Sequence, residues 1–283
     1  MWWLLGLLAI VLATWGILST RGVVYPQRLP IPPPDPLPPS VCHHLLSPDG
    51  SSFDVWVLDA ATPRGRVLLC HGYYANHFQM FALAQGLRVR GYEVLLFELR
   101  GHGVRPGPCT LGIREAQDAA IVLSWAKTRD HGRTLPVAVI GWSMGAVVAA
   151  LVAGQAEEIR AVVTDSAYSR LFPVLKQAIR RRYHLPAVPW AWLTWWGLHL
   201  ALGRRLSALD PAHLAAQRTE PLLAIHGGSD VRVEPRLGEE LVARWAGPRQ
   251  RWLEATVGHV GMFARDPEGY CNRVVAFLQE AMA

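Results

Sequence analysis

The sequence predicts an α/β domain with a mostly parallel central sheet and helices on both faces. Short apolar runs at 66–71, 92–98 and 136–142 alternate with stretches of helical periodicity at 115–129 and 144–154. Apolar runs separated by crossover helices are typical of parallel strands that are buried on both faces. The chain has 283 residues, 51% of them hydrophobic, which is enough for one such domain with its own core.

The first twenty residues predict a transmembrane anchor. Residues 1–20 carry no charged side chain, and twenty helical residues span roughly 30 Å, the thickness of the bilayer core. A signal peptide is the alternative, but it needs a basic n-region and a small-residue cleavage site. The helix is instead followed by Arg21 and Arg28, with no basic side chain before it. We expect an uncleaved single-pass anchor in the membrane; two arginines leave the side of the membrane open.

The next twenty residues, 21–40, predict a proline-rich linker. The run PQRLPIPPPDPLPPS favours polyproline II, and so a semi-rigid spacer that lifts the domain off the membrane. The folded domain then occupies 41–283, beginning with a hairpin at 41–59 around the turn SPDGS.

A tryptophan-rich insertion at about 170–217 interrupts the alternation. We expect a helical cap over the carboxyl edge of the sheet, where ligands bind in such folds. Two interpretations stay open: a cap that packs its tryptophans on the pocket, or a lid that faces the membrane. Both favour an apolar ligand. The residues concerned are Trp190, Trp192, Trp195 and Trp196.

The segment Gly141-Trp142-Ser143-Met144-Gly145 lies between an apolar strand and a small-residue helix. In that context a Gly-x-Ser-x-Gly pattern raises the serine on a turn so tight that larger flanking side chains would collide. Ser143 is therefore the predicted nucleophile. The Met144 N–H, at the helix N-terminus, is a predicted oxyanion donor.

The second oxyanion donor is expected in the loop after the run at 66–71. Gly72 lets this backbone approach the nucleophile closely, and the Tyr73 N–H is the predicted donor. Tyr74 and Trp142 are expected to line the substrate pocket.

A nucleophilic serine needs a base, and the base needs an orienting carboxylate. His259 lies in the glycine-flanked loop VGHVG after the last expected strand, and it is the predicted base. Asp230, in HGGSD just past a strand end, is the predicted acid. Asp165 also ends a strand and is its rival.

Composition argues against two other function classes. The net charge of +6 comes mostly from scattered arginines, with no basic stripe or nucleic-acid-binding motif, so no nucleic-acid partner is expected. No two of the four cysteines stand at metal-ligand spacing, so we expect no zinc site.

Together these motifs resemble the α/β-hydrolase superfamily, specifically its bacterial esterases and serine-aminopeptidase-like members. The matching segments are HGYYAN (71–76), ELRGHG (98–103), TLGIREAQD (110–118), GWSMG (141–145), IHGGSD (225–230) and VGHVGMF (257–263). The chain departs from the family where Glu98 stands in place of a common Asp. The resemblance implies an α/β-hydrolase fold and cleavage of an ester, thioester or amide through an acyl-enzyme, a reaction that requires neither a metal nor an organic cofactor.

The sequence thus predicts a serine hydrolase that cleaves carboxylic esters of a small-molecule apolar acyl substrate, with thioesters and lipids as further candidates, through a Ser-His-Asp triad. A peptidase or acyltransferase with the same triad is one alternative. A non-catalytic binding protein on the same fold is another.

Overall fold

The buried strands of the domain form one sheet in the computed structural model, which describes residues 2–130, 132, 134–156, 158–203, 206 and 211–283. In this part of the chain, eight strands pair in the order β1-β2-β4-β3-β5-β6-β7-β8. The β1–β2 and β2–β4 pairs are antiparallel and the other pairs are parallel, as expected for the predicted fold. The strands are β1 (Val41–Leu46), β2 (Ser52–Leu58), β3 (Arg66–Cys70), β4 (Glu93–Phe97), β5 (Val137–Trp142), β6 (Ile159–Asp165), β7 (Leu222–Gly227) and β8 (Arg249–Glu254).

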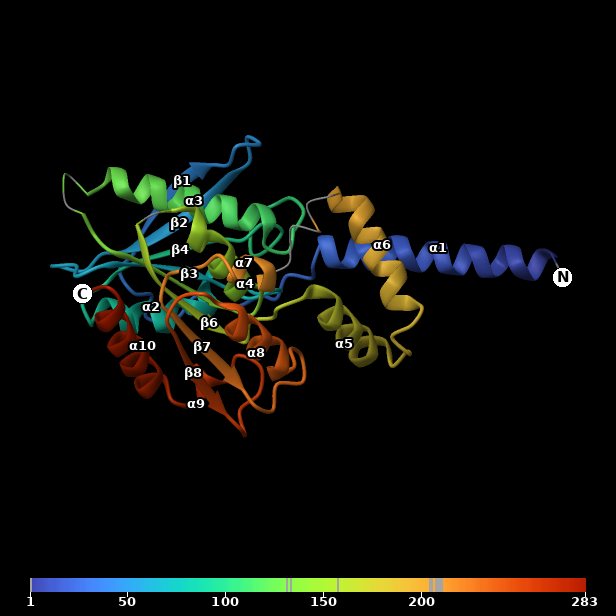
Figure 1. The fold of residues 1–283 in the computed structure, drawn as a ribbon. Coiled ribbons are helices and arrows are strands. Elements are labelled where there is room, and N and C mark those ends of the chain that lie inside the picture. The colour runs from blue at the N-terminus through green and yellow to red at the C-terminus, as the bar shows by residue number, and fades with distance from the viewer. Residues whose placement is uncertain (1, 131, 133, 157, 204–205, 207–210) are drawn as a thin grey trace.

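Helices cover both faces of this sheet, and each face has its own apolar core (Figure 1). One core includes side chains of α3, α4, α7 and α8, and the other includes side chains of α2, α9 and α10. Every residue of β3, β4 and β5 is buried, which explains their continuous apolar runs. The helices of the domain are η1 (His77–Met80), α2 (Phe81–Arg88), α3 (Ile113–Thr128), α4 (Met144–Val152), η2 (Ala153–Gln155), α7 (Pro211–Ala215), α8 (Pro235–Arg244), α9 (Met262–Arg265) and α10 (Pro267–Ala281).

The N-terminal helix α1 (Trp2–Val24) projects from the domain as a single rod (Figure 1). It is long and apolar enough to cross a membrane, although a signal sequence also meets that test. The helix continues four residues past the expected boundary at residue 20. Its last turn contacts the domain, where the Cys109 N–H donates to Val24 O at 2.7 Å.

The segment after α1 corrects the expectation of a spacer that stands clear of the domain. The Leu29 N–H donates to Tyr74 O at 2.9 Å, and Asn76 Nδ2 donates to Ile31 O at 2.9 Å. Extended, proline-rich backbone has few internal hydrogen bonds, here one from the Ile31 N–H to Leu29 O at 3.0 Å, so its remaining carbonyl and N–H groups can pair with a neighbouring loop. The first part of the linker is therefore docked on the loop that follows β3.

The insertion between β6 and β7 contains α5 (Leu171–Tyr183) and α6 (Trp190–Leu202). Gln177 of α5 donates to Val231 O at 3.0 Å, which places this helix beside the loop after β7. The insertion thus lies at the carboxyl end of the sheet. Within it, Trp192 and Trp196 are 45% and 62% exposed, so the tryptophans do not all pack on the sheet edge.

Helix α6 crosses α1 at close range (Figure 1). Trp15 Nε1 donates to Trp190 O at 3.1 Å, and Thr194 Oγ1 donates to Ser19 Oγ at 2.8 Å. A Cβ on Gly197 would lie 3.1 Å from the Gly16 carbonyl oxygen, so glycine permits this approach. Small residues at a helix crossing are typical of membrane-embedded helix pairs.

Candidate active site

Ser143 sits on a sharp turn between β5 and α4. Its backbone lies in a strained region, with φ 55° and ψ −115°. A Cβ on Gly145 would lie 2.0 Å from Cys70 O, and a Cβ on Gly141 would lie 2.0 Å from Gly145 O. The steric reason for both glycines, inferred from the sequence pattern, is therefore present in the folded chain.

The structure brings the three predicted residues of the triad together. His259 Nε2 lies 2.9 Å from Ser143 Oγ, and His259 Nδ1 lies 2.7 Å from Asp230 Oδ2. Asp230 follows β7 and His259 follows β8, and these parallel strands end at the same edge of the sheet. A serine, an imidazole and a carboxylate in this order can pass a proton from the hydroxyl to the ring.

Asp230 is buried and held as a carboxylate. Its Oδ1 accepts the N–H groups of Arg232 at 2.8 Å and Val233 at 2.9 Å. Burial alone would raise the pKa of Asp230, but hydrogen bonds from His226 and His259 hold that pKa well below its usual range. Asp230 therefore stays ionised at neutral pH.

His226 is a second imidazole on the same carboxylate, which the sequence did not single out. Its Nε2 lies 3.4 Å from Asp230 Oδ2 and 3.0 Å from Val233 O. Burial lowers the pKa of His226, but the hydrogen bond to Asp230 and the Val233 carbonyl raise it by more. The available signal was its spacing of four residues from Asp230, yet its place in an apolar strand indicated a core residue.

Asp165 was the alternative candidate for the acid of the triad. In the structure it is hydrogen-bonded through Ser166 to the loop that contains His259. Its Oδ1 accepts from Ser166 Oγ at 3.0 Å, and Ser166 Oγ in turn accepts the Val260 N–H at 3.0 Å. Its Oδ2 accepts from Tyr270 Oη at 3.2 Å. Burial raises the pKa of Asp165 to about 6. The carboxylate that faces His259 Nδ1 is thus that of Asp230.

The two predicted oxyanion donors lie beside the nucleophile turn and in the loop after β3. The Met144 N–H is the first of α4, where helices have no partner for it, and the Tyr73 N–H has no hydrogen bond among the described residues. The Tyr73 phenol turns away to the end of α1 and donates to Val23 O at 2.7 Å. Only the backbone of Tyr73 is then left for the site.

The two residues that were expected to line the substrate pocket lie in different environments. Tyr74, at φ 70°, is 39% exposed. Trp142 is buried in the core, where its Nε1 donates to Tyr270 Oη at 3.1 Å. This position corrects the expectation that Trp142 lines the substrate pocket: it packs beneath the nucleophile turn with Phe263 and Tyr270.

One group in the described part of the chain has the residue types and spacing to hold a metal ion. Ligand atoms of Cys42, His44 and Asp54 lie within 4.8 Å of one another on the β1–β2 hairpin. Cross-strand pairing of His44 with Asp54 creates this group, which cysteine spacing alone did not reveal. It belongs to different elements from the triad.

Comparison with known proteins identifies the fold that carries this geometry. Residues 65–188 match the family model of the α/β hydrolase fold. The esterase Pf2001 of Pyrococcus furiosus superposes with a TM-score of 0.75 at 24% identity, over 92% of this chain and 98% of that one. The chain has the α/β-hydrolase fold. The match in fold agrees with the predicted order of strands and helices.

Two relatives by sequence extend this result. The uncharacterized protein Rv2307c of Mycobacterium tuberculosis is 28% identical over 270 residues, covering 94% of this chain and 87% of that protein. A monoacylglycerol lipase of Mycolicibacterium smegmatis is 36% identical over 97 residues, a third of either chain. With the fold, the esterase and lipase similarities support a hydrolase.

Proposed function

We propose that this α/β hydrolase is a membrane-anchored serine hydrolase that cleaves carboxylic esters with apolar acyl groups. The observation that carries the proposal is the continuous hydrogen-bonded series from Ser143 Oγ through His259 to Asp230. This arrangement gives a serine hydroxyl the adjacent base that nucleophilic attack requires.

In the proposed reaction, Ser143 Oγ attacks the ester carbonyl carbon while His259 Nε2 takes its proton. The ionised Asp230 accepts a hydrogen bond from Nδ1–H and stabilises the imidazolium that forms. The N–H groups of Met144 and Tyr73 stabilise the oxyanion. His259 then returns the proton to the leaving alkoxide, and water attacks the acyl-enzyme by the same route.

The exposed apolar surface of the insertion supports the proposal of an apolar acyl substrate. Helix α6 has no charged residue, and Trp196 and Leu200 are exposed on it at 62% and 88%. Exposed apolar surface of this kind marks contact with lipid or an apolar ligand. The short stretch of similarity to a monoacylglycerol lipase points in the same direction.

We also propose that α1 is kept as a membrane anchor rather than removed. Its residues pack against α6 and its last turn pairs with the loop at Cys109, so the helix is part of the folded unit. A cleaved signal peptide would leave the inner face of α6 uncovered.

A p-nitrophenyl ester series tests the proposed activity on the full chain in detergent. We expect kcat/KM to rise with acyl length beyond two carbons, because each buried methylene adds about 0.8 kcal/mol. Ser143→Ala should remove at least about 10³-fold of kcat. Equal turnover of the series by wild type and Ser143→Ala would overturn the proposal.

A further inference from the structure

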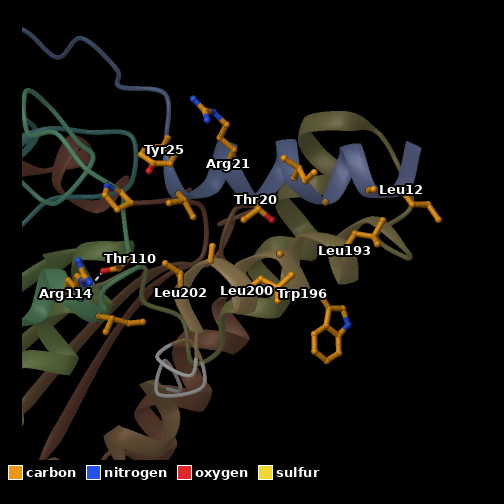
Figure 2. A pocket seen from close by; sticks show the side chains of 18 residues that line it. Leu12, Thr20, Arg21, Tyr25, Thr110, Arg114, Leu193, Trp196, Leu200 and Leu202 are labelled. Carbon is orange, nitrogen blue, oxygen red and sulfur yellow. Dashed lines mark hydrogen bonds between the residues drawn. The ribbon is translucent and has the colours of Figure 1, made fainter. Parts of the chain in front are cut away.

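An apolar groove separate from the triad runs between α1, α6 and the loop before α3. It encloses about 880 Å³ (Figure 2). Leu12 and Ile17 line it from α1, and Leu193 and Trp196 line it from α6. None of the three triad residues is part of its wall, so the groove is not the place where the ester is attacked.

The two ends of the groove differ in chemistry. In Figure 2, Leu12 and Leu193 lie toward one end, while Arg21, Thr110 and Arg114 lie toward the end at the hydrolase domain. The polarity of the lining side chains thus increases from apolar groups on the projecting helix to guanidinium groups beside the domain.

Both arginines line the groove at its domain end; in Figure 2 the Arg21 guanidinium points away from α6, and it lies 5.6 Å from the centre of the Tyr25 ring. Arg21 lies in the last turn of α1, where a spanning helix meets the headgroup level, and no carboxylate forms an ion pair with it among the described residues. Arg114 is paired at 3.1 Å with Asp49, itself shared with Arg100, so its charge is only partly neutralised.

We propose that this groove binds one anionic glycerophospholipid from the surrounding leaflet. An acyl chain lies between α1 and α6, and the phosphate lies near Arg21 and Arg114. Because the groove wall is α1 itself, the molecules that surround it in a bilayer are lipids, and the cationic end favours a headgroup with a net negative charge. The proposal rests on the proposed insertion of α1 and not on hydrolysis.

The position of the groove gives such a lipid a structural role. The Cys109 N–H donates to Val24 O, and Cys109 Sγ lies 3.7 Å from Met144 Sδ, beside the nucleophile turn. A chain that fills the groove would hold α1, α6 and the loop at 108–114 in one arrangement near this turn.

Native mass spectrometry of the full-length Ser143→Ala protein in a non-ionic detergent tests the proposal. Because Ser143→Ala prevents turnover, this experiment measures lipid binding alone. A failure to bind lipid is therefore distinguishable from a failure to hydrolyse esters. We expect one phosphatidylglycerol per protein, bound at least tenfold more tightly than phosphatidylcholine. Inorganic phosphate alone should neither bind measurably nor compete.

Two sets of variants, each with a control, test where the lipid binds. Ala201→Trp and Ala13→Trp fill the groove from opposite walls and should each weaken phosphatidylglycerol binding at least tenfold. Leu18→Trp, on an exposed part of α1 outside the groove, is their control. Arg21→Gln combined with Arg114→Gln should abolish the preference for phosphatidylglycerol, whereas Arg181→Gln on α5 should not.

Lipid binding is compared only between groove-filling variants whose thermal stability equals that of the parent protein. Because the two substitutions lie on opposite walls, each is an independent test. Undiminished binding in both Ala201→Trp and Ala13→Trp would overturn the proposal. So would several equivalent bound lipids, which indicate a non-specific annulus, or competition by free phosphate, which indicates an anion site alone.

Discussion

At the scale of single residues, the site depends on close backbone contacts that only small side chains allow. Ser143 keeps its strained φ of 55° because α4 starts directly against the end of β3. The sequence pattern predicted this turn and the identity of Ser143, Asp230 and His259. It could not predict His226 or the Asp165–Ser166 support, because those side chains meet only when β6, β7 and the histidine loop are assembled.

Gly145→Ala tests the close contact directly. The added Cβ would lie 2.0 Å from the Cys70 carbonyl oxygen, a backbone atom that cannot rotate away. We expect a loss of about 3 kcal/mol or more in unfolding free energy, measured by urea denaturation in detergent. Gly22→Ala, where nothing lies within 4 Å, is the control and should be neutral. Matching stability of the two variants would contradict this account.

The buried Asp165 predicts a pH-dependent stability term. Its carboxyl titrates near 4 in an unfolded chain and at about 6 in the folded one, so the folded protein binds the extra proton between these values. The stability contribution of Asp165 is therefore full below pH 4 and is lost as the pH rises through 6. Relative to that of the wild type, the unfolding free energy of Asp165→Asn should increase by about 2 kcal/mol between pH 4 and pH 7. Urea denaturation across this range checks it; a constant difference would refute it.

At the scale of elements, periodicity and turn residues were sufficient for the sheet but not for the insertion. The hairpin at 41–59 and the strands at 66–71 and 136–142 follow from local pattern. Helix α6 has no polar face, so its sequence does not say which side packs. Its contact with α1 depends on Gly197, where a Cβ would lie 1.9 Å from Thr20 Oγ1 of α1, and no single segment reveals this pairing.

A disulfide test measures whether α1 stays on α6. In a Cys42→Ser background, Ser19→Cys with Thr194→Cys should oxidise to a disulfide, since the two hydroxyl oxygens are 2.8 Å apart. After maleimide labelling in denaturant, the intact mass of the oxidised variant would show two fewer free thiols than that of the reduced variant. Leu18→Cys with Thr194→Cys is the control, because Leu18 is exposed on α1. Equal oxidation of both pairs, or loss of α1 from the purified chain, would contradict the proposed anchor.

At the scale of the whole molecule, the docked linker and the α1–α6 contact place the hydrolase domain directly against its proposed anchor. The proline-rich composition predicted a semi-rigid spacer that lifts the domain off the membrane, because composition describes the stiffness of the chain and not its partners. The hydrogen bonds of residues 25–31 to loops at Tyr74 and Asn76 are long-range and could not be predicted from that segment. This arrangement keeps the loops of the proposed triad near the proposed membrane surface, where the proposed apolar ester would be found.

Fluorophosphonate labelling of the full-length protein, with the modified peptide identified by mass spectrometry, tests the central claim most directly. A serine activated by His259 reacts with this probe, whereas an ordinary hydroxyl does not. We predict one labelled site, Ser143, in the wild type, none in Ser143→Ala, and at least tenfold slower labelling in His259→Ala. A folded wild-type protein that is not labelled at Ser143 would contradict the proposed serine hydrolase.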